Sequence, residues 1–338
     1  MIDINFFTSS NRYVSIPTKN NPKLLLAIDN NQIASNSFNL YNPFSKNGKF
    51  FKFFLNFLFS KLNIFSRVLY KTNLYEKSKF INFLEKKLNQ NLISSIYLAT
   101  DRDKVVLQLQ DKKYRVIAYL KYPITNTGIE HIKNEKNAMD ILSKEYLLYS
   151  TFNEIPFIIL KPLNGIIDNI SSSKLKNILS DFSRGRNSKY SLSEHPRINS
   201  ILGSLKEDIN LKEYLDVTNS IINISRQKYN LVYEHGDFTP WNIIKNKEEY
   251  TIFDFEYFIE DGIEYFDLIK YHYMVGKLLN KLDNVDLIDY ILSQIDNNIL
   301  NILQLFLIKE IILKSINNSS YLFEKKLLHI LGTKYAKN

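Results

Sequence analysis

At residues 235–242 the chain reads His235-Gly236-Asp237-Phe238-Thr239-Pro240-Trp241-Asn242, and at residues 252–256 it reads Ile252-Phe253-Asp254-Phe255-Glu256. Asp237 and Asn242 lie five residues apart, and Asp254 follows twelve residues later at the end of an apolar run. Transfer of a phosphoryl group from ATP needs a carboxylate beside the attacking hydroxyl, and an amide plus a second carboxylate that hold Mg²⁺. The alternative is an ordinary loop, because Gly, Asp, Thr, Pro and Asn all favour turns.

The two stretches resemble the aminoglycoside phosphotransferase and choline kinase superfamily, the small-molecule branch of the protein-kinase-like fold. Its members carry His-Gly-Asp-x-x-x-x-Asn on the catalytic loop and an Asp-x-Glu or Asp-x-Asp pair at the end of the next strand. The resemblance implies that Asp237 is the catalytic base and that Asn242 and Asp254 bind Mg²⁺. It also implies that Glu256 assists Asp254 at the metal.

The same resemblance implies structural roles around the catalytic loop. His235 and Gly236 match positions that shape this loop in the superfamily. In Tyr265-Phe266-Asp267-Leu268, the aspartate matches a position that caps and braces it. We therefore expect Asp267 to be a structural residue.

A kinase of this type also needs a lysine on a strand, which holds the α- and β-phosphates, and a helix glutamate that holds the lysine. Residues 114–121 read as a strand rich in β-branched and aromatic residues that ends at Lys121. Glu135 lies on a predicted amphipathic helix, and Glu130 is the second candidate partner. Solvated surface charges are the alternative interpretation of these residues.

The predicted nucleotide loop departs from the family pattern. The hairpin at residues 94–109 contains no glycine, although bare backbone approaches phosphate closely. Thr100 and the neighbouring amides are then the candidate phosphate contacts. Residues 155–165 predict a strand that runs into a Pro/Gly turn, and the resemblance implies that the backbone from Leu160 to Leu163 binds the adenine edge.

The pattern of the chain divides into three parts. Residues 1–90 form an N-terminal extension, residues 91–163 carry the short strands and single helix of a kinase N-lobe, and residues 164–338 are mostly helical. Apolar residues recur every three or four residues, the spacing of an amphipathic helix, over Lys174–Asp181, Lys206–Gln227, Asp267–Leu282 and Asp286–Leu331. We expect an α+β, bilobal protein-kinase-like fold, with a small antiparallel sheet in the N-lobe and a helical C-lobe.

Composition limits the class of protein and of partner. The 338 residues are 45% hydrophobic and include no cysteine, so a sizeable core is expected, while disulfides and thiolate chemistry are excluded. No basic-then-apolar signal opens the chain, which predicts a cytoplasmic protein. The net charge of +9 comes from dispersed lysines. It therefore does not predict nucleic-acid binding, and it favours a neutral or anionic acceptor over a polycationic one.

Residues 49–65 form an unusual aromatic segment. On a helical projection Lys49, Lys52, Asn56, Ser60 and Asn63 fall on one narrow arc, and nearly every other residue is apolar. The segment is too short and too often interrupted to cross a bilayer. It is typical of a helix at a membrane interface, and equally of a helix packed against the N-lobe, which we favour.

The sequence thus predicts an ATP- and Mg²⁺-dependent kinase that phosphorylates a hydroxyl of a sugar or similar polyhydroxy compound, in cell-envelope polysaccharide synthesis. A nucleotide-binding pseudokinase or scaffold is the alternative, and the glycine-free hairpin is its only support. A protein kinase is disfavoured, because Gly236 stands where protein kinases have arginine and no Ala-Pro-Glu follows Asp254.

Overall fold

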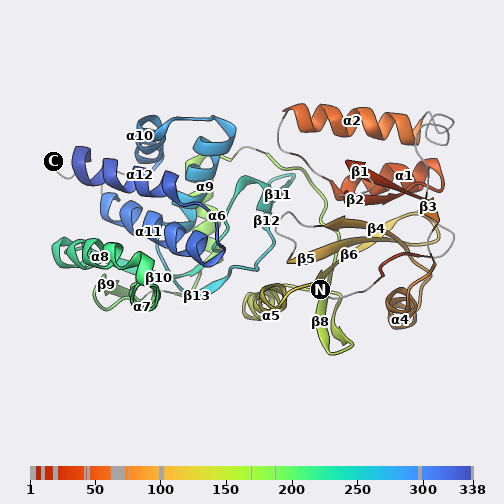
Figure 1. The fold of residues 1–338 in the computed structure, drawn as a ribbon, viewed down its shortest axis with the longest axis horizontal. Helices are drawn as coiled ribbons and strands as arrows, with labels where there is room; N and C mark the ends of the chain where they lie inside the picture. The colour runs from red at the N-terminus through yellow and green to blue at the C-terminus, as the bar shows by residue number, and fades with distance from the viewer. Residues whose placement is uncertain are drawn as a thin grey trace. The chain divides into compact units, whose positions relative to one another are not determined.

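The computed structural model describes residues 5–8, 12–17, 22–41, 43, 46–61, 73–74, 76–98, 103–168, 170–186, 188–295 and 299–335. The chain divides into two compact units, Met1–Asn164 and Gly165–Asn338. Most of the strands belong to the first unit and most of the helices to the second (Figure 1). The predicted α+β class, with one strand-rich and one helix-rich unit, is confirmed.

One antiparallel sheet, of eight strands over the described residues, forms the centre of the first unit. Residues before 91 supply three of them. On β1 and β2 neighbouring side chains enter different core clusters: Tyr13 and Leu25 join one, Val14 and Leu24 the other. This follows from the two-residue period of a strand. The order is β3 (Asn73–Leu74), β1 (Arg12–Pro17), β2 (Pro22–Ala27), β4 (Ile93–Leu98), β5 (Lys104–Gln110), β6 (Val116–Pro123), β8 (Ile155–Leu160) and β7 (Leu148–Phe152).

Helices lie on both sides of this sheet (Figure 1). On one side are α1 (Asn31–Ser37), the short η1 (Phe38–Leu40) and α2 (Lys46–Ser60); on the other are α4 (Lys79–Leu88) and α5 (Asn126–Ile141). Helix α5 begins at the N-cap Thr125, whose side chain accepts a hydrogen bond from Gly128 N. Its buried stripe includes Glu135 among apolar residues, and this stripe packs against β6 and β8.

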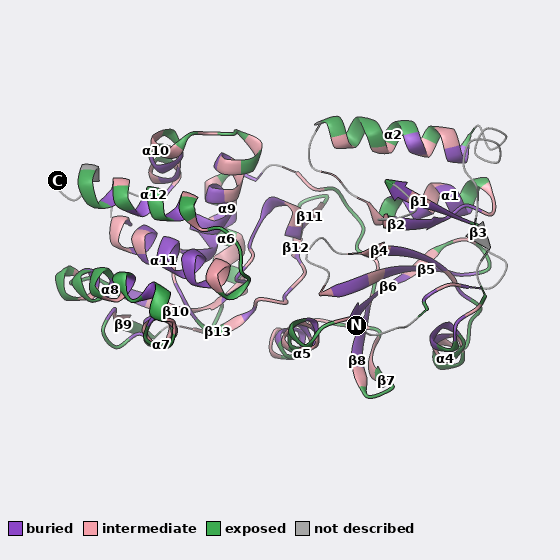
Figure 2. Cartoon of the chain, viewed as in Figure 1, coloured by how far each residue is buried: buried purple, intermediate pink, exposed green. Residues whose placement is uncertain are grey.

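The aromatic segment folds as helix α2, and both of its faces are informative. Leu55 and Phe59 are buried in a core cluster with α1 and β1–β2. The opposite face is exposed (Figure 2), with Phe50 71% and Phe53 70% accessible. The helix therefore does pack on its own unit, through its inner face. Residues 62–65 of the predicted segment lie outside the described residues.

The second unit is built around long helices and two small sheets. Strands β13 (Ile259–Ile263), β10 (Lys228–Glu234) and β9 (Lys189–Ser191) form one sheet, and β11 (Ile243–Asn246) and β12 (Glu249–Ile252) form a hairpin. The α-helices are α6 (Ser172–Phe182), α7 (Pro196–Glu207), α8 (Glu213–Ile224), α9 (Phe266–Met274), α10 (Asn284–Gln294), α11 (Leu300–Ile316) and α12 (Leu322–Ile330). Two short 3₁₀ helices, η2 (Ile209–Leu211) and η3 (Pro240–Asn242), and two π-helical segments, η4 (Val275–Leu279) and η5 (Leu331–Tyr335), accompany them.

Two of the predicted helical segments are interrupted in the structure. Asp208 takes up extended backbone and ends α7, so residues 206–227 contain the end of α7, the turn η2 and helix α8. Residues 286–331 contain α10, α11 and α12 in place of one helix. Each of these helices buries its own apolar stripe, so the helical spacing of apolar residues runs on across the breaks. The spacing alone therefore does not show where one helix ends and the next begins. Among the described helices, none is both long and apolar enough to cross a bilayer.

Candidate active site

In the first unit, Lys121 and Glu135 form a buried ion pair. Lys121 Nζ lies 2.6 Å from Glu135 Oε1 and 2.7 Å from Oε2, and the two side chains are only 10% and 2% exposed. The other candidate partner, Glu130, is exposed and pairs with Lys133. A buried, bidentate lysine–carboxylate pair fixes the position of the ammonium group, so Lys121 carries a rigidly placed positive charge.

The other nucleotide-contact candidates lie at the ends of neighbouring elements. Thr100 lies outside the described residues, between β4 and β5. Leu160 is the last residue of β8 and is half-buried, and Leu163 is exposed in the segment after it. In this unit the structure therefore brings together Lys121 and Glu135. Leu160 ends β8, and residues 161–163 lie outside regular secondary structure.

In the second unit, the loop at 235–239 follows β10 directly and is braced by Asp267. The Asp267 carboxylate, at the start of α9, accepts hydrogen bonds from His235 N at 2.6 Å and from Gly236 N at 3.1 Å. This confirms the bracing role predicted for Asp267. Gly236 has φ +81°, and a Cβ there would lie 2.2 Å from the carbonyl oxygen of Tyr257. Only glycine fits this turn.

His235 connects this loop to the end of β12. Its Nδ1 accepts a hydrogen bond from Asp237 N at 3.3 Å, and its Nε2 lies 2.9 Å from the carbonyl oxygen of Phe253. Both contacts are satisfied when the proton is on Nε2, which donates to that carbonyl. The imidazole therefore ties the backbone of Asp237 to the residue that precedes Asp254.

The predicted base and metal ligands lie together around the β11–β12 hairpin. Asn242 Nδ2 donates to the carbonyl oxygen of Asp237 at 2.9 Å and to its Oδ2 at 3.1 Å. Across the hairpin, Phe253 N donates to Asn242 O at 3.1 Å, so Asp254 comes directly after a residue bonded to Asn242. Glu256 follows and is half-buried.

The donor set around Asn242 suits a hard cation. Asn242 turns its amide nitrogen to Asp237, so its amide oxygen can serve as a metal ligand. The carboxylate of Asp254 is the second candidate ligand. Oxygen ligands of this kind are those that Mg²⁺ prefers. No three His, Asp or Glu side chains gather into a ready-made metal site in the described part of the chain. A cation bound here would therefore complete its shell with ligand or water oxygens.

A chain of buried charges, which the sequence reasoning missed, begins at Asp237. Lys270 Nζ lies 3.7 Å from Asp237 Oδ1 and 2.9 Å from Glu310 Oε2. Lys309 Nζ lies 3.1 Å from Glu310 and 3.5 Å from Glu234. Arg197 completes the chain with a bond of 3.0 Å to Glu234 Oε2. Charges of opposite sign thus alternate from the loop into the core of the unit.

Burial and neighbouring charges have opposite effects on the pKa values of these charged residues. Burial acts to lower the pKa of Lys270, but the carboxylates of Glu310 and Asp237 outweigh it and raise that pKa. Burial acts to raise the pKa of Glu310, yet the charges of Lys270 and Lys309 lower it to about 2. Burial, with the Glu234 carboxylate second, raises the pKa of Asp267. The signal for part of this chain was visible in the sequence, as a Lys309-Glu310 pair inside the apolar run of α11.

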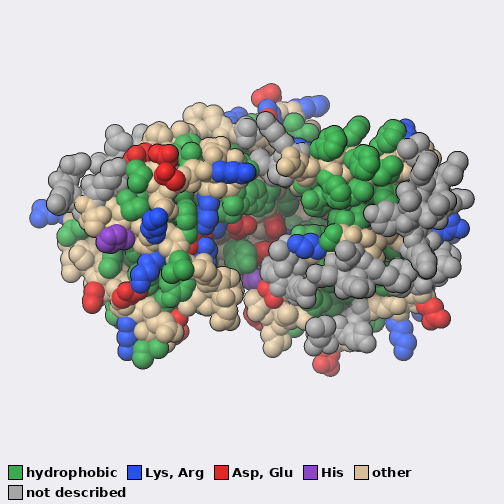
Figure 3. Space-filling model, turned by 45° about the horizontal axis from the view of Figure 1, so that its top comes forward, with side chains coloured by type: hydrophobic (Ala, Val, Ile, Leu, Met, Phe, Trp, Pro, Cys, Tyr) green, Lys and Arg blue, Asp and Glu red, His purple; other side chains and the backbone are tan. Residues whose placement is uncertain are grey.

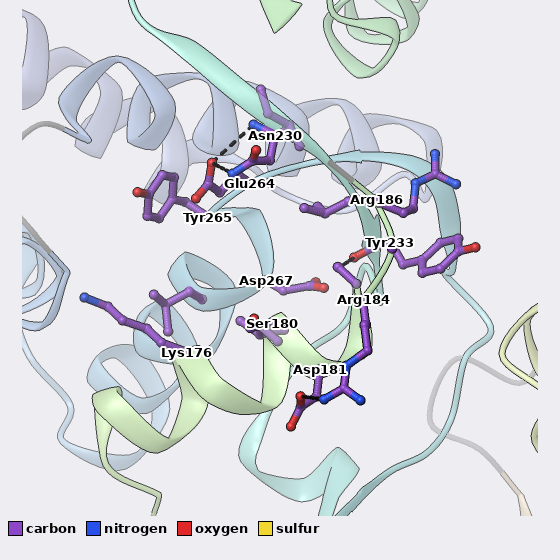
Figure 4. Close-up of a pocket in the computed structure, with 16 residues that line it drawn as sticks. Lys176, Ser180, Asp181, Arg184, Arg186, Asn230, Tyr233, Glu264, Tyr265 and Asp267 are labelled. Atoms are coloured by element: carbon purple, nitrogen blue, oxygen red, sulfur yellow. Dashed lines mark hydrogen bonds and ion pairs between the residues drawn. The ribbon is translucent and has the colours of Figure 1, made fainter. Parts of the chain in front are cut away.

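A pocket of about 690 Å³ lies between α6, β10, β13 and the start of α9 (Figure 4). Its wall includes Asp267, and on the same wall Asn230 donates to the neighbouring Glu264 at 2.8 Å. Arg186, which also lines it, pairs with Asp261 at 2.8 Å and lies over the ring of Tyr233. Apart from Asp267, none of the residues singled out from the sequence lines this pocket, so it is distinct from the Asp237–Asn242 cluster.

Comparison with known proteins gives distant structural likenesses. No family model matches the sequence, and no curated protein matches it. Among solved structures, an amicoumacin kinase in complex with AMP-PNP, Ca²⁺ and Ami aligns at 13% identity with a TM-score of 0.42, covering 74% of this chain and 91% of that one. Plasmodium vivax ethanolamine kinase aligns at 13% identity and a TM-score of 0.42, covering 91% of this chain and 95% of that one.

A choline/ethanolamine kinase family protein from Mesorhizobium loti aligns at 13% identity and a TM-score of 0.35, covering 70% of this chain and 86% of that one. All three carry the names of kinases or of a kinase family. Similarity of this degree is too slight to transfer an activity, so the function must be argued from the residues of this chain.

Proposed function

We propose that this protein is an ATP- and Mg²⁺-dependent phosphotransferase that acts on a hydroxyl group. The observation that carries the proposal is the Asp237–Asn242 contact, in which one amide orients the carboxylate of the predicted base. Across the β11–β12 hairpin, the backbone hydrogen bond between Phe253 and Asn242 brings Asp254, the next residue, close to Asn242. Phosphoryl transfer needs a base and two oxygen ligands in fixed positions, because its catalysis is mostly positioning and charge neutralisation.

Each predicted residue has a role in this proposal. Asp237 accepts the hydrogen bond of the acceptor hydroxyl and takes its proton. Asn242 and Asp254 hold the metal, and Glu256 supports Asp254. Bound MgATP supplies the phosphoryl group, and the metal neutralises its charge.

On the nucleotide side, Lys121 holds the phosphates and Glu135 keeps its ammonium group in place, as their buried pair supports. The backbone from Leu160 to Leu163 binds the adenine edge. Thr100 and the amides around it cover the phosphates. These three contributions come from the strand-rich unit, which we propose is the nucleotide-binding lobe, with residues 1–90 as its extension.

The proposed acceptor is a sugar or a similar polyhydroxy compound. The net charge of +9 disfavours a polycationic acceptor and suits a neutral or anionic one. The proposed setting is cell-envelope polysaccharide synthesis, where sugars are carried on lipids at the inner face of the membrane. This assignment is by analogy with the predicted family, since a fold does not specify a substrate.

We further propose that the protein is cytoplasmic and that it contacts the membrane peripherally through the outer face of α2. Five phenylalanines lie on that face, Phe50, Phe51, Phe53, Phe54 and Phe57, and all are exposed. Figure 3 shows hydrophobic side chains gathered over this part of the first unit. Five exposed phenylalanines on one face of a helix are atypical of a protein surface that contacts only water.

The chemistry of this face favours anionic lipid over a protein groove. On a helical projection Lys61, which is exposed, falls on the same arc as the five phenylalanines, and Lys49 lies on its flank. Aromatic rings enter the boundary between headgroups and acyl chains, and lysines at the edge attract acidic headgroups.

Turnover measured against a panel of sugars tests the proposed activity. Formation of ADP together with a phosphorylated sugar is expected for at least one neutral or anionic acceptor. The alternative is a pseudokinase that binds MgATP without turnover. Binding of MgATP with no phosphorylated product across the panel, and no ADP formed with water as acceptor, would favour that alternative.

A further inference from the structure

Lys270 is a buried lysine whose charge meets the predicted base. It lies on α9, one turn after Asp267, and its side chain is 10% exposed. A buried ammonium group is costly unless it is paired. Its described partners are Glu310 at 2.9 Å and Asp237 at 3.7 Å. One of these partners belongs to the core and the other to the catalytic loop.

The Asp237 carboxylate is held at both of its oxygens. Asn242 donates to Oδ2 at 3.1 Å, and the Lys270 ammonium group lies 3.7 Å from Oδ1. An amide on one oxygen and a cation near the other restrict the rotation of the carboxylate about its χ2 angle. The side chain nevertheless remains 29% exposed, so it can still reach a ligand.

The position of Lys270 is itself fixed by charges deeper in the unit. Glu310 and Lys309 come from α11, Glu234 from β10 and Arg197 from α7. Each charge has a neighbour of opposite sign, so Lys270 cannot turn away without leaving Glu310 with one partner fewer. Glu310 of α11 thus holds the ammonium group that faces the base, and the charges on β10 and α7 hold Lys309 beside Glu310.

We propose that Lys270 is a positioning residue for phosphoryl transfer, acting through Asp237. This inference rests on the proposed function. Lys270 holds the carboxylate of Asp237 in the orientation that accepts the hydrogen bond of the acceptor hydroxyl, and Glu310 holds Lys270. The two residues are thus part of the active site although neither lies in the predicted motif.

The test compares Lys270→Met with Lys270→Arg, using MgATP with water as the acceptor and ADP release as the readout. This probe does not require the natural acceptor. Lys270→Met should lower kcat by about 10²-fold, because misorientation of a catalytic group costs that much. The KM for ATP and the calorimetric affinity for MgATP should stay unchanged. Lys270→Arg, which keeps the charge, should recover most of the loss.

Lys277→Met is the matched control. Lys277 follows α9 in η4 and pairs with the buried Glu324 at 2.8 Å, so its loss breaks a similar pair away from Asp237 and should leave kcat unchanged. If Lys270→Met unfolds, Lys270→Met with Glu310→Gln removes both charges and should show the same fall in kcat.

Two results would overturn the inference. One is a folded Lys270→Met, or the double variant, with the kcat of the wild type. The other is a fall in kcat that Lys277→Met reproduces or that Lys270→Arg fails to recover. Absence of turnover by the wild-type protein would instead contradict the proposed function, so the two failures are distinguishable.

Discussion

Asp254 adopts a left-handed backbone conformation, with φ +67°. This region is uncommon for residues other than glycine and costs about 1 kcal/mol or more. The neighbours of Asp254 hold it there: Phe253 is bonded to Asn242, and Phe255 is buried against His235 and Phe182. A strained residue held this firmly is typical of functional sites, and the backbone here fixes the direction in which the Asp254 side chain leaves the chain.

We expect Asp254→Ala to abolish Mg²⁺-dependent binding of ATP and Glu256→Ala to weaken it less. Asp254 is held by the hairpin that carries Asn242, whereas Glu256 lies two residues further along. Calorimetric titration of MgATP into both variants measures the difference, and titration of ATP with EDTA gives the metal-independent baseline. Equal losses in the two variants would mean that both carboxylates share the metal.

Acid should weaken the fold through Glu310. Its pKa lies at about 2 against an ordinary value of 4.5, so its charge stabilises the fold above pH 4.5. That contribution, about 3 kcal/mol for such a shift, is lost as the pH falls from 4.5 through 2. Glu310→Gln should therefore be less stable at pH 7 and should lose less stability between pH 4.5 and 2.

Denaturant unfolding at a series of pH values measures this contribution. Glu213→Gln is the control, because Glu213 pairs with Lys325 at the surface, where such pairs contribute little. Parallel curves of unfolding free energy against pH for wild type and Glu310→Gln would contradict the account.

At the scale of the element, α2 has two apolar faces with different partners. Its inner face joins the core cluster of β1–β2 through Leu55 and Phe59, and its outer face exposes five phenylalanines. A helix needs only one apolar stripe to pack on a globular unit. The second stripe is exposed among the described residues, and we propose that its partner is an anionic membrane surface.

Serine substitutions on the two faces should have opposite effects. Phe50, Phe53 and Phe57 changed to serine should release the protein from vesicles that contain phosphatidylserine, with no fall in melting temperature. Leu55 and Phe59 changed to serine should lower the melting temperature, since each buried large side chain contributes about 2–3 kcal/mol. Co-sedimentation and thermal unfolding measure the two effects.

Wild-type binding to these vesicles should weaken as salt is added, because the lysines are screened. Neutral phosphatidylcholine vesicles are the matched lipid control and should bind less. Absence of the wild-type protein from every vesicle pellet would contradict the membrane proposal. Equal binding to neutral and acidic vesicles would show that the lysines do not contribute to binding.

The elements that sequence predicts well are those specified by neighbouring residues. The loop from His235 to Asn242 and the strand before Asp254 are local in the chain, and the structure places them side by side. Helix ends were harder to predict, because the apolar period runs on through breaks such as Asp208. The link from Asp237 through Lys270 to Glu310 could not be predicted from spacing, since these two residues lie 33 and 73 residues after Asp237 in the sequence.

At the scale of the whole molecule, the proposed function draws on residues of both units. The strand-rich unit holds the Lys121–Glu135 pair, and the helix-rich unit holds Asp237 with its hairpin and buried charges. In the proposed reaction the first supplies the charge that binds phosphates, and the second supplies the base and metal ligands. Among the described residues each unit contributes only part of this set, so we expect catalysis to need the intact chain.

The most direct test of this account is phosphoryl transfer by wild-type protein and by Asp237→Asn, followed with radiolabelled γ-phosphate and the sugar panel. Asparagine keeps the size of the side chain and loses the base, so MgATP affinity and melting temperature should change little. We predict labelled sugar from the wild type and almost none from Asp237→Asn. Equal transfer by the two proteins would contradict the assignment of Asp237 as the catalytic base.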